Sequence, residues 1–148
     1  MRVVVQRVLE ASCKVDGEVT GSINRGFLLF IGYKDGDNEA IEDRMLKKIA
    51  GLRIFEDEAG KMNKSLKDVD GSILAISQFT LYADCKHGNR PSFTEAMKFD
   101  EANRRYLDFC NRLRALGLKV EMGIFGADMK ISLLNDGPVT IILDSDFL

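Results

Sequence analysis

Residues 3–19 read VVVQRVLEASCKVDGEV, and this stretch decides the fold class. β-Branched residues stand on both sides of Asp16-Gly17, and an Asp-Gly pair between such segments is typical of a β-hairpin. We therefore expect a strand and a tight turn at the start of the chain. The apolar run from Phe27 to Ile31 contains no polar residue, which indicates a strand buried on both faces.

Helical spacing of apolar residues predicts a first helix that begins after the acidic residues 35–39 and stops near Gly51. We expect a second helix directly after Pro91, because Ser92 and Glu95 have the spacing of a capping box. Both helices have an apolar side that can cover a sheet.

Four further segments are rich in strand-forming residues: 72–82, 118–122, 131–134 and 139–143. Strands outnumber helices and do not alternate with them one for one. We therefore expect an α+β fold in which a mixed or antiparallel sheet curls into a barrel-like core with two main helices. The 148 residues form a single domain, 1–148, because the length fits one core and no linker interrupts it.

The overall charge excludes binding to nucleic acid by bulk basicity. Lys and Arg total 21 against 23 Asp and Glu, a net charge of −2, so any contact with a polyanion must be local. No apolar stretch is long enough to cross a membrane and no signal peptide is present, so we expect a cytoplasmic protein without membrane contact. Three cysteines without a Cys-x-x-Cys pair fit a reducing compartment and small apolar roles.

The sequence gives little support for a metal site or a cofactor-binding site. His87 is the only histidine, so zinc sites with two or more imidazoles are excluded and any catalytic triad would depend on this residue. The carboxylate groups at 35–39 and 144–146 lack the spacing of a calcium loop. The glycines in 123–129 do not have the dinucleotide fingerprint and fit a bent strand or a turn. We expect no metal and no cofactor.

Polar residues at the end of an apolar strand are the first candidate site. Ser77, Gln78 and Thr80 lie in or at the end of segment 72–82, and a buried polar group without a hydrogen bond costs about 1–3 kcal/mol. They form either an internal network or a place where the strand meets a ligand. The cationic, glycine-containing loop 86–93 is either a phosphate site before a helix or a solvated loop.

The segment from Asn135 to Thr140 joins two predicted strands. Pro138 removes a donor from the sheet, and the Gly137-Pro138 bond is a candidate for the cis form. Gly137 leaves carbonyl oxygens uncovered that can receive an ammonium group. An ordinary turn is the alternative.

Taken together, the segments 77–81 and 135–140 resemble the paired signature motifs of the D-aminoacyl-tRNA deacylases. The similarity extends over essentially the whole chain, through residues 1–8, 88–93 and 123–129. The resemblance implies a homodimer with its active site at the subunit junction. It also implies hydrolysis of the ester between a D-amino acid and the terminal adenosine of the tRNA 3′ end.

The resemblance further implies roles for individual residues. Gly137 and Pro138 are a cis pair that reaches into the partner's pocket, where main-chain oxygens receive the substrate ammonium, and Arg7 fixes their loop. Residues implied to line the pocket beside the ester are Ser77, Gln78, Phe79 and Thr80, of which the last three are the expected catalytic residues. Residues implied to hold the terminal adenine are Phe125, Gly126 and Met129.

These implied roles explain how the reaction could proceed without a histidine triad. Under the resemblance, we expect main-chain N–H groups near Phe79 and Thr80 to stabilise the oxyanion and the neighbouring hydroxyl of the RNA to supply the acid–base group. We also expect an L side chain to be excluded by a clash with the main chain at Gly137-Pro138, whereas glycine on mischarged tRNA-Ala has no side chain to reject.

Three alternatives stay open. The first is Thr80 as a covalent nucleophile, although no base for it is evident. The second is a noncatalytic module that binds an RNA end or a nucleotide in the same pocket. The third is a purely structural dimer.

Overall fold

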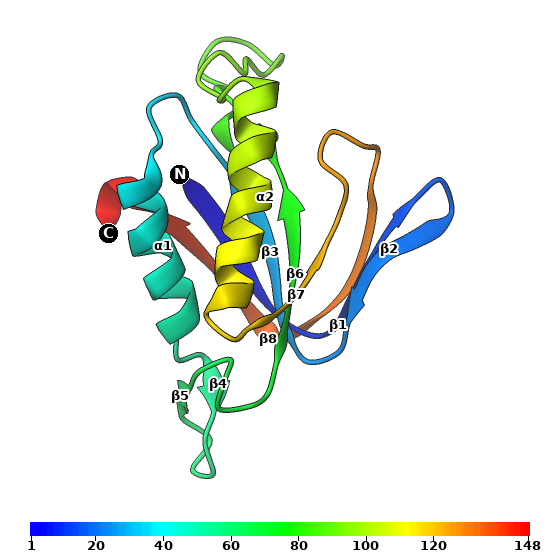
Figure 1. Ribbon diagram of the computed structural model, residues 1–148, viewed down its shortest axis with the longest axis vertical. Coiled ribbons are helices and arrows are strands. Elements are labelled where there is room, and N and C mark those ends of the chain that lie inside the picture. Colours follow the sequence, from blue (N-terminus) through cyan, green and yellow to red (C-terminus); the bar gives the residue numbers. More distant parts are fainter.

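A six-stranded mixed sheet forms the centre of the molecule (Figure 1). The computed structural model describes residues 1–148. The strands of this sheet are β1 (Arg2–Val15), β2 (Glu18–Ile23), β3 (Gly26–Gly32), β6 (Ser72–Ser77), β7 (Lys119–Met122) and β8 (Lys130–Asp144). β1 pairs antiparallel with β2, β3 and β8, whereas β3 with β6 and β6 with β7 are parallel pairs. A separate small hairpin consists of β4 (Phe55–Glu56) and β5 (Met62–Lys64).

The sheet curls until its two ends almost meet. Its order is β2-β1-β3-β6-β7, and the two end strands approach each other at Gly21 of β2. A Cβ atom at Gly21 would lie only 2.8 Å from the carbonyl oxygen of Met122 in β7. A side chain there would therefore push the ends apart. The predicted α+β class and the barrel-like curl of a mixed sheet are confirmed.

Two helices, α1 (Glu39–Gly51) and α2 (Phe99–Ala115), lie side by side across one face of the sheet (Figure 1). The start of α1 is as predicted, because the Asn38 side chain caps it by accepting the N–H of Ile41 at 3.1 Å. Two short 3₁₀ helices complete the elements: η1 (Phe79–Tyr82) and η2 (Ser145–Phe147).

The prediction that α2 begins directly after Pro91 is wrong, since the helix starts at Phe99. The backbone before it pairs with the chain beyond β3: the Asp35 N–H donates to the Glu95 carbonyl at 3.3 Å and the Met97 N–H to the Tyr33 carbonyl at 3.0 Å. The Ser92–Glu95 capping box therefore does not form. Nor does the cationic loop 86–93 lead into a helix N-terminus.

The predicted strand 72–82 is too long. β6 ends at Ser77, opposite Ile31 of β3, and the chain then turns into η1. β3 itself ends one residue later at Gly32, so no parallel partner is left for residues beyond Ser77. Gly32 also makes room for the turn, because a Cβ there would lie 3.0 Å from both the Gln78 carbonyl oxygen and the Leu81 Cβ.

The predicted strands 131–134 and 139–143 are the two halves of β8, which both pair with β1. Asn135 is the partner of Val8 and Thr140 is the partner of Gln6, so residues 136–139 bulge out opposite the single residue Arg7. The segment is therefore a bulge within one strand and not a turn between two.

Buried side chains form one cluster on each face of β3. Phe27 and Leu29 belong to the larger cluster, which includes the buried faces of α1 and α2, and Leu28 belongs to a smaller cluster with Leu74 and Ile76. This arrangement confirms that the apolar run is buried on both faces. No helix is long and apolar enough to span a membrane.

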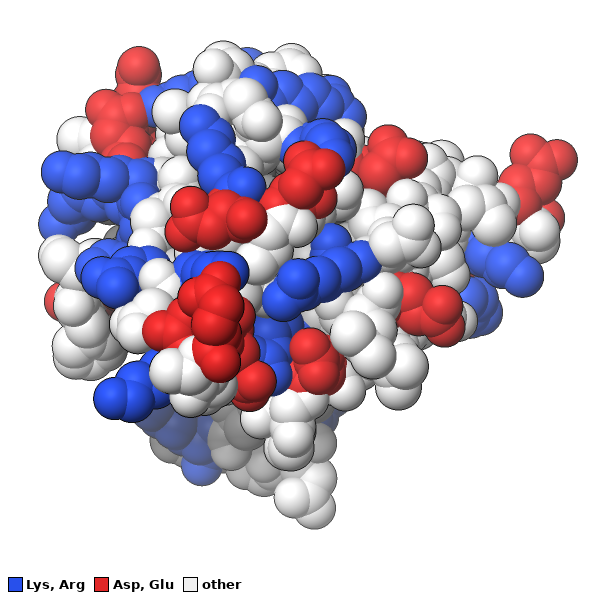
Figure 2. Space-filling view, turned by 90° about the horizontal axis from the view of Figure 1, so that it is seen from below, with Lys and Arg blue, Asp and Glu red and all other residues white.

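The three cysteines are unpaired. Cys13 and Cys110 are buried as small apolar residues, as expected, whereas Cys85 is exposed. On the face shown in Figure 2, basic and acidic side chains are interspersed, which fits the nearly balanced charge of the chain.

Candidate active site

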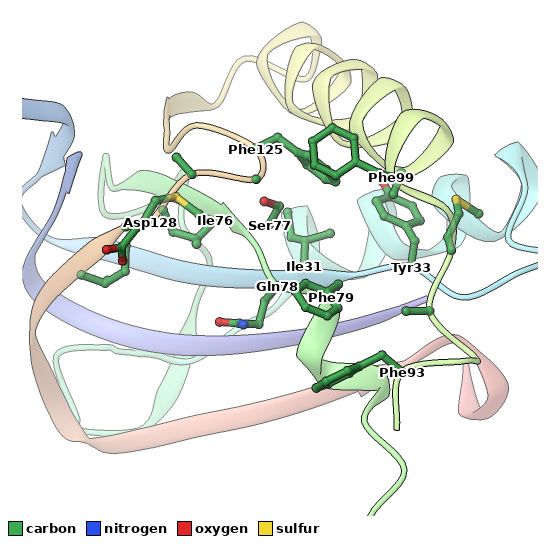
Figure 3. A pocket seen from close by; sticks show the side chains of 17 residues that line it. Ile31, Tyr33, Ile76, Ser77, Gln78, Phe79, Phe93, Phe99, Phe125 and Asp128 are labelled. Carbon is green, nitrogen blue, oxygen red and sulfur yellow. The ribbon is translucent and has the colours of Figure 1, made fainter. Parts of the chain in front are cut away.

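A pocket of about 570 Å³ opens between the end of β6, the start of α2 and the loop 123–129 (Figure 3). It brings together residues from two of the segments singled out in the sequence. Ser77, Gln78 and Phe79 line it from β6 and η1. Phe125, Gly126 and Met129 line it from the loop. Six of the predicted site residues thus share one cavity, although nearly fifty positions separate the two groups in the sequence.

Two aromatic pairs form walls of the pocket (Figure 3). Phe99 lies edge-on to Phe125 with ring centres 4.8 Å apart, and Phe79 lies edge-on to Phe93 at 5.0 Å. Phe79 is 55% exposed, so its ring stands at the mouth and not in the core. Aromatic rings that line a pocket can bind a flat heterocycle, because aromatic rings attract each other in offset or edge-on arrangements.

One carbonyl group of β6 connects the elements that carry the pocket residues. The Ala75 carbonyl oxygen accepts the Tyr106 hydroxyl at 2.6 Å and the Gly123 N–H at 3.2 Å. These two bonds attach α2 and the loop 123–129 to the strand that carries Ser77. The two groups of pocket residues are thereby held at a set separation.

The 3₁₀ helix η1 presents its first residues to this pocket. The first N–H groups of any helix have no partner within it, and in η1 these belong to Phe79 and Thr80. The Thr80 side chain is exposed, does not line the pocket, and its hydroxyl accepts a hydrogen bond from the Gln78 side-chain amide. The side chain of η1 that lines the pocket is therefore that of Phe79, and the N–H groups of Phe79 and Thr80 have no partner within η1.

Few titratable side chains line the pocket. Tyr33 is buried, and burial, followed by the charge of Glu42, raises the pKa of its hydroxyl. Asp128 is exposed at the rim and ion-paired with Lys130 at 3.0 Å. No group of three or more His, Cys, Asp or Glu side chains is placed to hold a metal ion. His87 lies on an exposed loop outside the pocket.

The remaining predicted residues lie elsewhere. The Gly137-Pro138 peptide bond is cis, and both residues are exposed in the bulge of β8, outside the pocket of their own chain. Arg7 is buried behind the bulge. Its Nε donates to the Asp136 carbonyl oxygen at 2.9 Å and its Nη1 to the Ile54 carbonyl oxygen at 2.7 Å.

The family model described as D-Tyr-tRNA(Tyr) deacylase matches residues 4–144. The chain belongs to this family. A D-aminoacyl-tRNA deacylase of Thermomicrobium roseum is 57% identical over 98% of this chain and 94% of its own length. A second, of Exiguobacterium sibiricum, is 56% identical over 97% of this chain and 99% of its own length.

Solved structures show the same fold. A structure titled c-Myc DNA Unwinding Element Binding Protein superposes with a TM-score of 0.91 at 42% identity, over 97% of this chain and 98% of that chain. A probable eukaryotic D-amino acid tRNA deacylase superposes with a TM-score of 0.81 at 18% identity, over 96% and 97% of the two chains. The second likeness concerns the fold alone.

Membership in this family agrees with the resemblance seen in the sequence, but sequence reasoning missed part of the pocket. Phe93, Phe99 and Tyr33 line it, and none was assigned to the site. Phe99 is the first residue of α2 and is exposed. Because the sequence predicts a helix that begins after Pro91, no local signal distinguishes Phe99 as a residue at the helix start.

Proposed function

We propose that this chain is a D-aminoacyl-tRNA deacylase that hydrolyses the ester between a D-amino acid and the tRNA 3′ end. The observation that supports this best is the single pocket in which the strand-end residues and the loop 123–129 meet. Terminal adenine binds against Phe125, Gly126 and Met129. The ester then lies toward Phe79 and the start of η1.

The chemistry depends on main-chain donors and on the substrate itself. N–H groups of Phe79 and Thr80 stabilise the oxyanion that forms when water attacks the ester carbonyl. The 2′-hydroxyl of the terminal ribose supplies the acid–base group. This assignment of roles is supported by the lining of the pocket, whose titratable side chains are the buried Tyr33 and Asp128 at the rim. Thr80 has no basic side chain as a hydrogen-bond partner, which disfavours it as the nucleophile.

Stereochemical choice comes from a second copy of the chain. We place the main-chain oxygens of Gly137 and Pro138 from one subunit in the pocket of its partner, where they hold the substrate ammonium. An L side chain then meets the main chain of this loop, whereas a D side chain points to open space. Glycine has no side chain to reject, so glycyl-tRNA(Ala) is a substrate as well.

An exposed apolar surface on β8 and η2 supports the homodimer. Ile142 is 66% exposed and Phe147 is 88% exposed, and Leu134 and Leu148 are exposed beside the same elements. β8 pairs only with β1, so its other edge has free N–H and C=O groups. Ile142, Phe147 and Leu148 line one surface cavity, and exposed apolar side chains next to an open strand edge are typical of an interface between subunits.

The first test is hydrolysis of D-Tyr-tRNA(Tyr) and L-Tyr-tRNA(Tyr) by the purified chain. We expect the lifetime of the D ester to shorten strongly and that of the L ester to stay the same. Unchanged lifetimes of both esters, together with binding of the tRNA, would favour the noncatalytic alternative. That alternative is kept because one similar structure is titled as a DNA-unwinding-element binding protein.

The second test asks whether one site uses two subunits. Gly126→Leu blocks the pocket and Arg7→Ala frees the loop, so each variant alone is expected to lose selective hydrolysis. When the two variants are coexpressed with different tags, mixed dimers form. In a mixed dimer the intact pocket of the Arg7→Ala chain receives the intact loop of the Gly126→Leu chain, so one of the two sites is intact. About a quarter of all sites should then be restored if the dimer is symmetric. No recovery in purified mixed dimers, or a fully active monomer by light scattering, would refute the shared site.

A further inference from the structure

The guanidinium group of Arg2 joins segments that lie far apart in the sequence. Its Nη1 donates to the Leu81 carbonyl oxygen at 2.6 Å, and its Nε donates to the Asp144 carboxylate at 3.0 Å. Its Cζ also lies 4.8 Å from the centre of the Tyr82 ring. Leu81 and Tyr82 are the last two residues of η1, so Arg2 attaches the end of η1 to the end of β8.

Neighbouring hydrogen bonds hold both the carboxylate that pairs with Arg2 and the backbone next to Arg2. The other Asp144 oxygen accepts the Asp146 N–H at 3.0 Å, which fixes the carboxylate at the start of η2. Next to it, the buried Met1 ammonium donates to Asp37 at 2.7 Å and to the Ser145 hydroxyl at 2.8 Å. The backbone that carries Arg2 is therefore anchored. A planar guanidinium can serve a carbonyl, a carboxylate and an aromatic face at once, which an ammonium cannot do.

η1 needs such a support. On one side it rests on Gly32, which offers no side chain to pack against. Its first two residues, Phe79 and Thr80, are exposed, although the Phe79 ring packs edge-on against Phe93 with ring centres 5.0 Å apart. The last carbonyl groups of a helix have no partner within the helix, and Arg2 supplies the donor for Leu81. Arg2 thus contributes a strong, charge-assisted restraint on the segment.

We propose that Arg2 is a positioning residue for the deacylation reaction. By holding the end of η1 it keeps the N–H groups of Phe79 and Thr80 aimed at the ester carbonyl, without touching the substrate. This inference rests on the proposed function, in which those N–H groups stabilise the oxyanion. A displacement of about 1 Å in a reacting geometry can cost about a hundredfold in rate, so a residue outside the pocket can control the chemical step.

The test compares kcat and KM of Arg2→Ala, Arg2→Lys and Asp144→Asn on D-Tyr-tRNA(Tyr). We expect kcat to fall about tenfold or more in both Arg2 variants and less in Asp144→Asn, with KM within about threefold, because adenine is bound by other residues. Arg53→Ala is the matched control. Arg53 also makes two hydrogen bonds, to the main chain and side chain of Asn63, but it does not touch η1.

Chemical rescue separates positioning from general stability. Arg2 is 35% exposed at its side chain and lines two surface cavities of about 430 and 740 Å³. Guanidinium ion at millimolar concentration can therefore enter the space left in Arg2→Ala. We expect it to raise kcat of that variant severalfold and to leave Arg53→Ala unchanged.

Two outcomes would overturn the inference: Arg2 variants with kcat within about twofold of the unchanged chain, or a loss of activity that follows only the folded fraction and is not rescued. If Arg2→Ala does not fold, Arg2→Lys decides by the same criterion, a fall in kcat with KM nearly unchanged. An unchanged chain that hydrolyses neither ester refutes the proposed function instead, and so distinguishes the two failures.

Discussion

The Arg7 side chain holds the main chain of Asp136, whose carbonyl oxygen accepts its Nε at 2.9 Å. Arg7 is the single β1 residue opposite the bulge 136–139. The paired strand β1 therefore also supplies the side chain that holds the bulge in place. Asn135 braces the bulge from inside: its side chain accepts the Val139 N–H at 2.9 Å and donates back to the Val139 carbonyl at 3.1 Å. The exposed Gly137-Pro138 segment is thus held rigidly from two sides.

Replacing Arg7 by Lys should loosen this loop. One ammonium cannot reach both the Asp136 and the Ile54 carbonyl oxygens, and leaving a buried acceptor unpaired costs about 1–3 kcal/mol. We expect a lower free energy of unfolding in denaturant titrations and a smaller ratio of D to L ester hydrolysis. Arg53→Lys, on an exposed arginine with a similar pair of bonds, should change neither. An unaltered D/L ratio in a destabilised Arg7→Lys chain would show that the loop does not select the substrate.

Ile142→Asp should break the proposed dimer. A carboxylate in an apolar interface must be desolvated without a partner, whereas on a free surface it costs almost nothing. We expect light scattering to report a monomer and selective hydrolysis to be lost. Val19→Asp is the matched control, because Val19 is also an exposed β-branched residue but lies in the hairpin strand β2. If both variants remain dimeric, the second copy binds to another surface.

Asp144 should contribute to stability at neutral but not at acidic pH. Burial acts to raise the pKa of this carboxyl, yet the Asp146 N–H and the Arg2 guanidinium together hold it below its ordinary value of 3.8. A lowered pKa in the folded chain means that stabilisation is present above pH 3.8 and is lost as the pH falls below it. Thermal unfolding of the unchanged chain and of Asp144→Asn should therefore differ at pH 7 and converge in acid. A constant difference between them across this range would contradict the pKa direction.

Local sequence patterns predicted which elements exist but not where two of them end. Phe79, Thr80 and Tyr82 are good strand formers, yet the strand stops at Ser77 because its parallel partners β3 and β7 end at Gly32 and Met122. The signals at Pro91 and Ser92 are those of a helix start, yet the backbone at 95–97 pairs with residues 33–35 instead. Both boundaries depend on contacts between distant segments, which periodicity does not record.

Only part of the candidate site could be predicted from the sequence, again because local patterns do not show contacts between distant segments. The polar residues Ser77, Gln78 and Thr80 at the end of an apolar strand indicated either an internal network or a ligand site, and the family resemblance added Phe79 and favoured the site. The link from these to the loop 123–129 came from the family resemblance, since nothing local says that Ala75 holds both Tyr106 and Gly123. Phe99 was missed because its role depends on the late start of α2.

Thr80→Ala should test whether the RNA or the protein supplies the reactive hydroxyl. Because the Thr80 hydroxyl accepts from Gln78 and has no base beside it, we expect kcat to fall by no more than about tenfold, equivalent to about 1.4 kcal/mol. D-Tyr-tRNA that ends in 2′-deoxyadenosine should in contrast not be hydrolysed by the unchanged chain. The measurement is single-turnover ester hydrolysis on both RNAs. Rapid turnover of the deoxy substrate, with an inactive Thr80→Ala chain, would make Thr80 the nucleophile.

Gly126→Ala should narrow the adenine end of the pocket. A Cβ at Gly126 would lie 2.6 and 2.8 Å from two ring carbons of Phe99, so the ring must turn away from Phe125. Gly126 also has a φ of +78°, which L residues rarely adopt, and Gly60 offers a control with the same strain, because its φ is +77° and no atom lies within 4 Å of its Cβ position.

Both variants should lose about 1 kcal/mol of stability through the backbone, but only Gly126→Ala should also raise KM for D-Tyr-tRNA(Tyr), with kcat little changed. Displacement of the Phe99 ring removes part of the wall against which the adenine lies, and this contact is the same in ground state and transition state. Steady-state kinetics on the two variants give the answer directly. Equal KM values in Gly126→Ala, Gly60→Ala and the unchanged chain would mean that the nucleobase does not bind against the wall formed by Phe125 and Phe99.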